Sequence, residues 1–263
     1  MNSIILLYIY ISLIQTIVYI ESTSRSFRIP QSSNYKWVYP FINSSFVKSI
    51  FEVGSRDLKD GNNLAHHFSC RVYSFEANPD NYDDMIRNNL DDRVNFVRTA
   101  VSDVDGYVIF YPYNLTLYNN RGAGSLLLAD FVTNRNIGDA DYNRSPVQYE
   151  RKVNSTRLDT FINKVSKIPP DLLAIDVQES ELTVLKSLGN YIDHIKYIIL
   201  ETTFYTQYHF GQNFSMINQY LNSRNFKMKV LKYQGKGGLV YTPPSKPING
   251  GGDVLYINLN HSF

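Results

Sequence analysis

The chain has 263 residues, of which 43% are hydrophobic, and a formal net charge of +2. This is enough apolar material for one sizeable core, and α/β domains of this length are commonly single, so we expect one folded domain. The small and scattered positive charge argues against a nucleic-acid-binding protein. Cys70 is the only cysteine, which excludes an internal disulfide framework and a cysteine-rich metal site, and we predict no bound metal.

Residues 1–21 form a hydrophobic N-terminal segment. Residues 4–20 are apolar except for Ser12, Gln15 and Thr16, and at about 1.5 Å per residue a helix of this length just crosses a bilayer core. Lysine and arginine follow this stretch but do not precede it. The positive-inside rule therefore predicts membrane association through a single N-terminal anchor, with the catalytic domain on the cytoplasmic side.

A cleaved signal and the secretory pathway are the alternative for this segment, although the basic region that opens a typical signal peptide is missing. Asn-x-Ser/Thr triplets, such as those at Asn43 and Asn114, would suit a lumenal protein. They arise readily by chance in a chain rich in Asn and Ser, so they carry little weight. We expect residues 22–36 to be a polar linker and residues 37–263 to be the folded domain.

Strands and helices alternate through the first part of this domain. Hydrophobic periodicity, and a proline that opens one helix, predict the following elements: a strand at 50–54, a helix within 62–68, a strand at 72–75, a helix at 79–90 that begins with Pro79, and a strand at 94–97. This order is typical of βαβ units in a parallel sheet.

The alternation is interrupted after the third strand. Residues 106–112 have the pattern of an additional strand, which we expect to pair with residues 99–102 across the Asp105-Gly106 turn signal. Residues 113–149 are rich in Asn, Tyr, Gly and Asp and have no clear period. A stretch this long inside a compact domain is usually a functional loop or a lid.

The alternation returns in the second half of the domain. The predicted elements are strands at 148–153, 172–177 and 195–200, helices at 158–164, 181–188 and 214–223, and two closing strands at 226–231 and 253–258. The closing strands flank a Gly/Pro-rich turn and can form a hairpin, which makes one strand antiparallel. The predicted fold is α/β, with a doubly wound, mostly parallel, seven-stranded, Rossmann-like sheet.

Ligands bind to such sheets beyond the carboxyl ends of the strands. Gly54 ends the first strand and Glu76 ends the second, a spacing typical of sites in which the acid binds the ribose hydroxyls of an adenosine group. The turn after Gly54 lacks the Gly-x-Gly-x-x-Gly pattern of a pyrophosphate site, and Asp57 within it would repel phosphate. S-adenosylmethionine has an ammonium group, a ribose and no phosphate, so the pattern favours this cofactor.

A set of motifs follows in a fixed order from about Ser49 to Glu201. The motifs are Phe51-Glu52-Val53-Gly54-Ser55-Arg56-Asp57, Val72-Tyr73-Ser74-Phe75-Glu76-Ala77-Asn78-Pro79, Ala100-Val101-Ser102-Asp103, Gly124-Ser125-Leu126, Arg157-Leu158-Asp159, and Ile175-Asp176-Val177-Gln178 with Glu181-Leu182-Thr183-Val184-Leu185-Lys186. As an ordered set they resemble the FkbM-type S-adenosylmethionine-dependent methyltransferases. The resemblance implies a class I methyltransferase fold and O-methylation, often of sugar or natural-product hydroxyls.

The resemblance also implies roles for particular residues. In the family pattern Glu76 would bind the ribose of the cofactor, Asp103 would lie near the adenine, and Asp176 would lie near the methionine amine or the acceptor. The residues that would line the methionine end of the cofactor are Glu52, Gly54, Ser55 and Asp57. One departure concerns Glu179, because the family usually has glycine at this position. A glycine there allows positive φ or close approach, so its loss could reshape the acceptor pocket or signal reduced activity.

Methyl transfer to a hydroxyl benefits from a base within hydrogen-bond reach. The candidates are Asp176, Glu201 and His209, of which we predict Asp176 and Glu201 to be catalytic. If Asp176, Glu179 and Glu181 face one another, their repulsion would raise the pKa of at least one of them toward neutrality.

We therefore expect an S-adenosylmethionine-dependent methyltransferase that acts on a hydroxyl of a glycan or small molecule. A catalytically impaired interaction protein with the same fold is the alternative that Glu179 leaves open. The turn from Ser55 to Asp57 argues against a third class, an oxidoreductase with a nucleotide cofactor.

Overall fold

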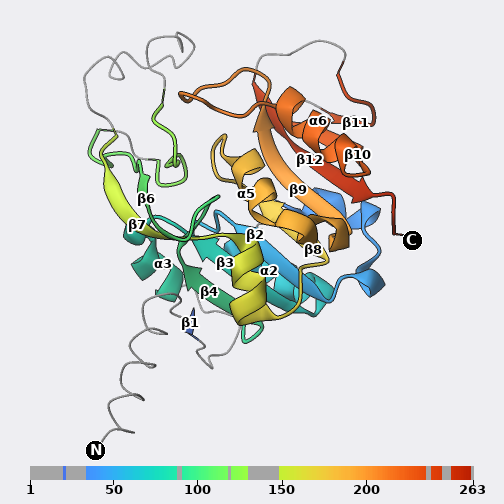
Figure 1. Cartoon of the computed structure of the whole chain (residues 1–263), viewed down its shortest axis with the longest axis horizontal. Helices are drawn as coiled ribbons and strands as arrows, with labels where there is room; N and C mark the ends of the chain where they lie inside the picture. The colour runs from blue at the N-terminus through green and yellow to red at the C-terminus, as the bar shows by residue number, and fades with distance from the viewer. Residues whose placement is uncertain are drawn as a thin grey trace, which may run out of the picture.

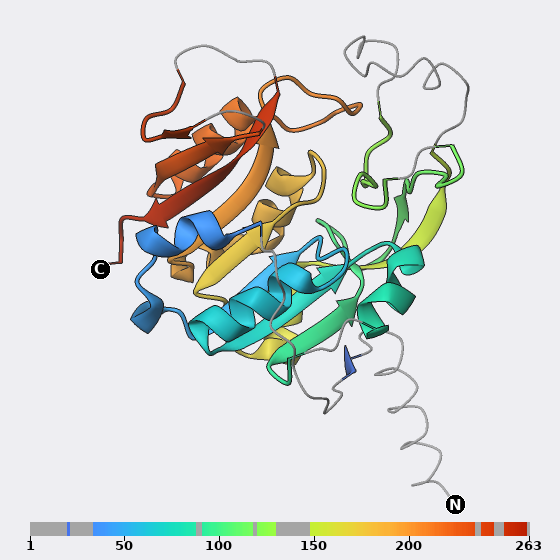
Figure 2. The same ribbon diagram turned by 180° about the vertical axis from the view of Figure 1, so that it is seen from behind.

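The computed structural model describes residues 20–21, 34–87, 91–117, 120–129, 148–234, 238–244 and 250–261. Within these residues the core is one sheet of strand order β1-β4-β3-β2-β8-β9-β12-β10-β11, with helices on both faces (Figures 1 and 2). Figure 1 shows α5 and α6 in front of the sheet, and Figure 2 shows the opposite face. The predicted α/β, doubly wound architecture is confirmed.

Five strands of the sheet are parallel, and they are β2 (Ser49–Val53), β3 (Arg71–Glu76), β4 (Val94–Arg98), β8 (Leu172–Ile175) and β9 (Tyr197–Thr203). Strand β12 (Gly251–Asn258) runs antiparallel to both β9 and β10 (Phe226–Tyr233), as predicted for the closing hairpin. The chain leaves β2 toward β3 on one side and reaches β8 on the other. The order of strands therefore reverses at β2, which is where ligands bind in open α/β sheets.

Two strands of two residues each extend this seven-stranded core, and the sequence pattern does not predict them. Strand β1 (Ile20–Glu21) pairs with β4, and β11 (Leu239–Val240) pairs with β10, both in the antiparallel direction. Residues 4–19 of the predicted membrane anchor lie outside the described part of the chain. In the part that is described, no helix has the length and apolar character needed to cross a bilayer.

The two faces of the sheet bury different residues of each strand, because successive side chains of a strand point to opposite faces. On one face Ile50 packs in a cluster with residues of α2 (Lys59–Phe68) and of a 3₁₀-helix, η1 (Lys36–Phe41). On the other face Phe51 and Val53 pack with residues of α4 (Leu158–Phe161), α5 (Glu181–Ser187) and α6 (Phe214–Ser223). Burial on both faces explains the near-continuous apolar runs of these strands.

The predicted hairpin between residues 99–102 and 106–112 is wrong. Strand β5 (Ala100–Val101) and strand β6 (Gly106–Phe110) do not pair with each other, because β7 (Arg151–Thr156) lies between them in a separate three-stranded sheet. Gly106 does adopt positive φ, at 111°, so the local turn signal is genuine. The strand that separates the two segments arrives about 50 residues later in the chain, which a local pattern cannot show.

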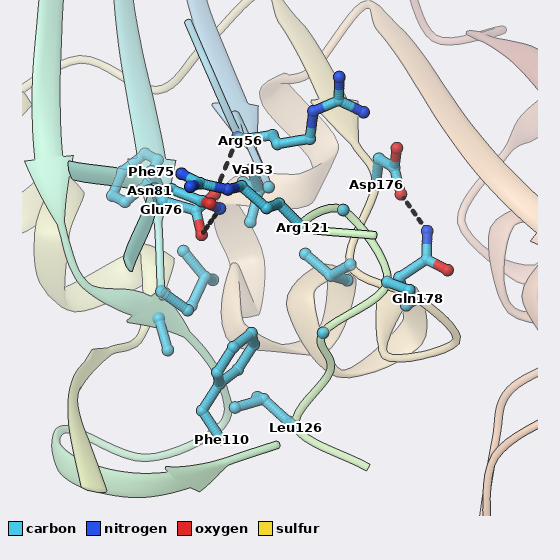
Figure 3. A pocket seen from close by; sticks show the side chains of 18 of the residues that line it. Val53, Arg56, Phe75, Glu76, Asn81, Phe110, Arg121, Leu126, Asp176 and Gln178 are labelled. Atoms are coloured by element: carbon cyan, nitrogen blue, oxygen red, sulfur yellow. Dashed lines mark hydrogen bonds between the residues drawn. The ribbon is translucent and has the colours of Figure 1, made fainter. Parts of the chain in front are cut away.

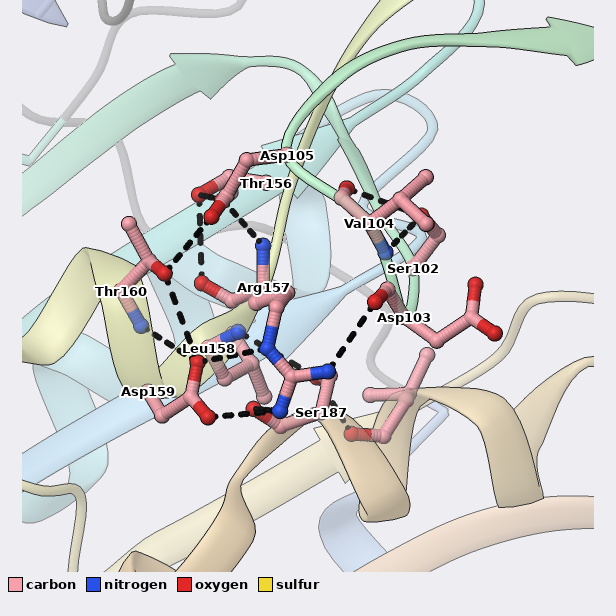
Figure 4. A network of polar contacts seen from close by, with 11 residues as sticks. Ser102, Asp103, Val104, Asp105, Thr156, Arg157, Leu158, Asp159, Thr160 and Ser187 are labelled. Atoms are coloured by element: carbon pink, nitrogen blue, oxygen red, sulfur yellow. Dashed lines mark hydrogen bonds and ion pairs between the residues drawn. The ribbon is translucent and has the colours of Figure 1, made fainter.

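Polar contacts connect the small sheet to the main domain (Figure 4). The guanidinium of Arg157 forms a two-pronged contact with the carboxylate of Asp159, at 2.9 and 2.6 Å, and also donates to the backbone carbonyl of Asp103. The carboxylate of Asp105 accepts from the Arg157 backbone amide and from Thr160 Oγ1. The motif Arg157-Leu158-Asp159 thus has a structural role, because it fixes the loop before β6.

Several helices differ from their predicted extents. The helix expected at 79–90 is divided into a 3₁₀ turn, η3 (Pro79–Asn81), and α3 (Tyr82–Arg87), and residues 88–90 lie outside the described ranges. The helix expected at 158–164 continues from α4 into a π-helical turn at Ile162–Ser166. Gly189 follows α5 with φ 54°, as expected for a helix-ending glycine, and a 3₁₀-helix, η6 (Gly189–His194), then begins. A further short 3₁₀ turn, η2 (Ser44–Phe46), precedes β2.

Candidate functional site

The site begins with the turn after β2, where three strand ends converge. Gly54 has φ 87°, and a Cβ atom at this position would lie 1.8 Å from the backbone oxygen of Asp176 at the end of β8. The amides of Gly54 and Ser55 both donate to the carbonyl of Phe75 at 3.0 Å. Glycine is required here both for its backbone conformation and for the close approach of two chain segments.

Glu76 is fixed at the end of β3 by the same turn (Figure 3). Its Oε2 accepts a hydrogen bond from the backbone amide of Arg56 at 2.8 Å, and its Oε1 accepts from the Asn78 amide and from Asn81 Nδ2. The side chain is 6% exposed, and burial raises the pKa of Glu76 to about 6. A carboxylate has about four lone-pair sites, so Oε2 retains the capacity to accept from a ligand hydroxyl.

A cavity of about 310 Å³, here named the first cavity, lies over these strand ends. Glu76, Gly54 and Asp176 line its polar side. Its apolar wall includes Phe110 and Leu126, which lie beside each other (Figure 3), together with Val101 and Ala77. An acid next to an apolar wall at the switch point of the sheet suits a nucleoside.

The predicted residues of the methionine end line a smaller cavity of about 130 Å³, here named the acidic cavity, and these residues are Glu52, Gly54, Ser55 and Asp57. Gly54 and Asp176 line both cavities, so the two spaces meet at the turn. Ser55 Oγ is buried and has no hydrogen-bond partner among the described residues. A buried hydroxyl of this kind marks a place where a ligand can satisfy it.

Two carboxyl groups of the acidic cavity have partners. Glu52 accepts from Ser74 Oγ at 2.5 Å, and burial, followed by repulsion from Asp60, raises the pKa of Glu52 well above its ordinary value. Asp57 forms an ion pair with Lys59 at 2.6 Å. Glu52 bonds to β3 and its carboxylate lies close to Gly61 of α2, so it ties these elements together at the floor of the acidic cavity.

The two predicted catalytic residues form a connected pair. Gln178 Nε2 donates to Asp176 Oδ1 at 2.8 Å and to Glu201 Oε2 at 2.7 Å, while Glu201 Oε1 accepts from Gln234. Repulsion from Asp176, then burial, raises the pKa of Glu201 well above its ordinary value. Glu201 is therefore protonated more readily than an ordinary glutamate.

Two residues weighed from the sequence lie away from these cavities. Asp103 does not line the first cavity, where Thr99, Ala100 and Val101 follow the end of β4, and Figure 4 shows contacts to its backbone carbonyl only. His209 lines none of the cavities described here, and its backbone amide donates to the carbonyl of Leu128.

Glu179 adopts a left-handed backbone conformation, which explains why the family usually has glycine at this position. Its φ is 68°, and its buried carboxylate accepts hydrogen bonds from Thr203 Oγ1 at 2.9 Å and from the amides of Gln207 and Tyr208 at 2.7 and 3.2 Å. Glu179 does not line the first cavity. The departure from glycine therefore leaves the nucleoside-shaped space open and links the turn after β8 to the loop after β9.

The expected rise in an acid pKa is confirmed for this region, but its main cause differs. Burial, rather than repulsion, is the largest contribution that raises the pKa of Glu181 to about 8, and repulsion from Asp176 and Glu179 adds to it. Burial is also the largest cause of the raised pKa of Glu179.

The first cavity includes residues that the sequence reasoning did not assign. Arg121 and Gly122 line it, Gly122 lies close to the Arg56 side chain, and Arg121 Nη1 donates to the Asp80 carbonyl at 3.3 Å. They belong to the segment 113–149, of which 113–117, 120–129 and 148–149 are described. The Gly-rich stretch Arg121-Gly122-Ala123-Gly124 was the available signal, since close packing against Phe110 requires a small residue at Gly124.

The sheet order and the acid at the end of β3 define a class I methyltransferase fold. Residues 53–228 match the model of the methyltransferase FkbM domain, and the chain belongs to this family. None of the curated proteins matches the chain significantly.

Solved structures are similar to this chain at low identity. M. capricolum TrmK in complex with S-adenosylhomocysteine is 13% identical, with a TM-score of 0.45, over 90% of this chain and 70% of that one. Magnesium protoporphyrin IX methyltransferase from Synechocystis PCC 6803, with bound S-adenosylmethionine, is 8% identical, with a TM-score of 0.42, over 84% and 74%. The fold assignment rests on the strand order and the family match rather than on these scores.

Proposed function

We propose that this protein is an S-adenosylmethionine-dependent methyltransferase that methylates a hydroxyl group of a glycan or small molecule. The observation that carries the proposal is the first cavity, in which the Glu76 carboxylate lies beside an apolar wall at the switch point of the sheet. Membership of the FkbM methyltransferase family supports it.

The residues present fit the cofactor. The ribose hydroxyls would bind Glu76, and the adenine would pack on Phe110, Leu126 and Val101. The methionine ammonium would face the acidic cavity, where carboxylates outnumber the basic side chains and Ser55 Oγ is unpartnered among the described residues. The bound cofactor supplies an electrophilic methyl group on a sulfonium.

The protein's own part in the reaction is to align the acceptor with the methyl group, to exclude water and to accept the hydroxyl proton. Alignment of the acceptor with the methyl group supplies much of the rate of an in-line displacement, and the walls of the cavity exclude water. Asp176 is held by Gln178 at the junction of the cavities and would accept the hydroxyl proton. Glu201, whose pKa is raised by repulsion from Asp176 and by burial, is joined to Asp176 through Gln178 and would help to hold it in place.

Calorimetric titration with S-adenosylmethionine, S-adenosylhomocysteine and a nicotinamide dinucleotide tests the proposal. We expect the two adenosyl ligands to bind and the dinucleotide not to bind. Glu76→Ala should weaken S-adenosylhomocysteine at least roughly tenfold, because a hydrogen bond to a charged group is lost. Asp103→Ala is the matched control, since this carboxylate lies outside the cavity and its removal should leave the affinity unchanged.

Equal affinities of the Glu76→Ala and wild-type proteins would remove Glu76 from the site, and absence of adenosyl binding would refute the proposal. A screen of glycans and small hydroxyl acceptors with labelled S-adenosylmethionine tests the reaction. Cofactor binding without transfer to any acceptor would favour the interaction protein that the Glu179 substitution suggests. The membrane anchor at 4–20, with the domain on the cytoplasmic side, stays a prediction.

A further inference from the structure

A cavity of about 230 Å³, here named the second cavity, adjoins the first one. Both are lined by Gln178 and Glu201, and also by Asn120 and Ala123. A ligand in the second cavity therefore lies beside Glu201 and beside Gln178, which bonds to Asp176, and next to a ligand in the first cavity. Its other walls come from the end of β9 and the loop after it, and from the first residue of α5, Glu181. Its volume is small for a drug-sized ligand and suits a single ring or an end group.

Glu181 is the unusual group of this cavity. The residue is 1% exposed, and its Oε1 accepts from the amides of Val177 at 3.1 Å and Glu179 at 3.2 Å, which secures the turn before α5. Its Oε2 is buried without a hydrogen-bond partner among the described residues. A buried polar atom that has no partner in the protein needs an explanation, and a bound ligand supplies one.

The chemistry of Oε2 follows from these contacts. Burial raises the pKa of Glu181 to about 8, so the group is mostly protonated at neutral pH. Because Oε1 already accepts two N–H groups, the proton belongs on Oε2. Glu181 is therefore a hydrogen-bond donor that lacks an acceptor.

The second cavity is lined by acidic side chains and by no basic ones in the part of the chain that the structure describes. Its described lining includes three glutamates and no lysine, arginine or histidine, and the remaining polar groups are amides and hydroxyls, among them Gln207, Gln234 and Thr203. Hydroxyl-rich molecules match such groups as both donors and acceptors. A carboxylate or phosphate would find no lysine, arginine or histidine in the described lining to compensate its charge.

We infer that the second cavity holds the methyl acceptor, that Glu181 donates a hydrogen bond from Oε2 to an acceptor oxygen, and that anionic acceptors are excluded. This inference rests on the proposed function, because the methyl group must arrive from the first cavity. In the reaction the acceptor oxygen forms a bond to the methyl carbon, and the sulfur–methyl bond breaks with its electron pair staying on sulfur. The hydroxyl proton passes to the Asp176 carboxylate.

The exclusion of anionic acceptors is tested with three glycosides that differ in charge. They are the neutral methyl glucoside, the cationic methyl glucosaminide and the anionic methyl glucuronide. Their dissociation constants are measured by ligand-observed NMR on the full chain, saturated with S-adenosylhomocysteine. The neutral and cationic glycosides should bind at least roughly tenfold tighter than the glucuronide. Equal binding of the glucuronide overturns the inference, and so does absence of binding by all three.

The role of Glu181 is tested by two substitutions. Glu181→Leu should weaken methyl glucoside at least roughly tenfold without changing the affinity for S-adenosylhomocysteine. Glu181→Gln keeps an oxygen for the two backbone amides and places an N–H donor where Oε2 was, so it should restore binding to within roughly threefold of wild type. If Glu181→Leu lowers thermal stability but leaves the glucoside affinity unchanged, its role is structural and the inference fails.

Gln207→Leu provides an independent variant, because its side chain lines the same cavity and takes no part in the turn before α5. It should weaken methyl glucoside, and an unchanged affinity counts against the cavity even if Glu181→Leu does not fold. Two different binding results separate failure of the proposed function from failure of this inference. Loss of S-adenosylhomocysteine binding by the wild type refutes the proposed function, whereas cofactor binding with no glycoside binding refutes the inference alone.

Discussion

The first and second cavities share Gln178 and Glu201 but are built differently. The first lies on the ends of β2, β3 and β4, where backbone amides hold the Glu76 carboxylate and apolar side chains form a wall. The second lies on the turn after β8 and the loop after β9, and its lining is mostly amides, hydroxyls and acids. The strand ends thus provide a site with a fixed acid and an apolar wall, and the loops provide a polar site whose lining can change without disturbing the sheet.

Gly54→Ala should have the largest effect, because it damages the junction of the cavities. The added Cβ would overlap the Asp176 carbonyl, and the backbone would be strained at positive φ. We expect unfolding free energy to fall by on the order of 3 kcal/mol or more in urea titrations. Gly106→Ala is the matched control, since Gly106 has φ 111° with no atom within 4 Å of a Cβ, and it should cost roughly 1–2 kcal/mol. Similar losses in the two variants would contradict the close-approach argument.

Glu179→Gly tests the wall of the second cavity. Glycine relieves the positive φ, but three hydrogen bonds to a buried carboxylate are lost, so we expect a net destabilisation of roughly 1–3 kcal/mol by thermal or urea unfolding. Lys167→Gly is the control, and its effect on the free energy of unfolding should have the opposite sign. Lys167 has φ 61° at an exposed helix end, so glycine there should stabilise the protein slightly. A stabilised Glu179→Gly protein would show that the carboxylate is not needed to hold the loop.

A further expected effect is a pH dependence of stability that separates the carboxyl groups. With a pKa of about 8, Glu181 binds more protons in the folded than in the unfolded chain from about pH 4.5 upward. The contribution of Glu181 to the free energy of unfolding is fully present below pH 4.5 and is lost as the pH rises through 8. Stability should therefore fall between about pH 4.5 and 8. Urea midpoints at pH 5, 6.5 and 8 should show a shallower fall for Glu181→Gln. Parallel curves for the two proteins would place the titrating group elsewhere, for example at Glu76 or at Asp253, because burial raises the pKa of each to about 6.

The sheet could be predicted from the sequence because strands buried on both faces appear as apolar runs, as in Leu172–Ile175. Its antiparallel strand could be predicted because the closing hairpin is local. The small sheet could not, since β7 inserts between two segments that precede it in the chain by about 50 residues. Pairing between distant segments has no local signal.

The site residues likewise differ in whether a local motif or a tertiary contact reveals them. Gly54 and Glu76 could be named because each ends a predicted strand in a local motif. The bridge from Gln178 to Asp176 and Glu201, the unpartnered Oε2 of Glu181 and the packing of Arg121 over the cavity depend on tertiary contacts. Asp103 shows the converse, because its motif is present while its side chain lies outside the cavity.

A crystal structure of the protein with S-adenosylhomocysteine tests the central claim most directly, because it shows which cavity the cofactor occupies. We predict ribose hydroxyls within hydrogen-bond distance of the Glu76 carboxylate, the adenine against Phe110 and Val101, and the second cavity left for the acceptor. A ligand that lies against Glu181 in the second cavity, or that makes no contact with Glu76, would contradict the account.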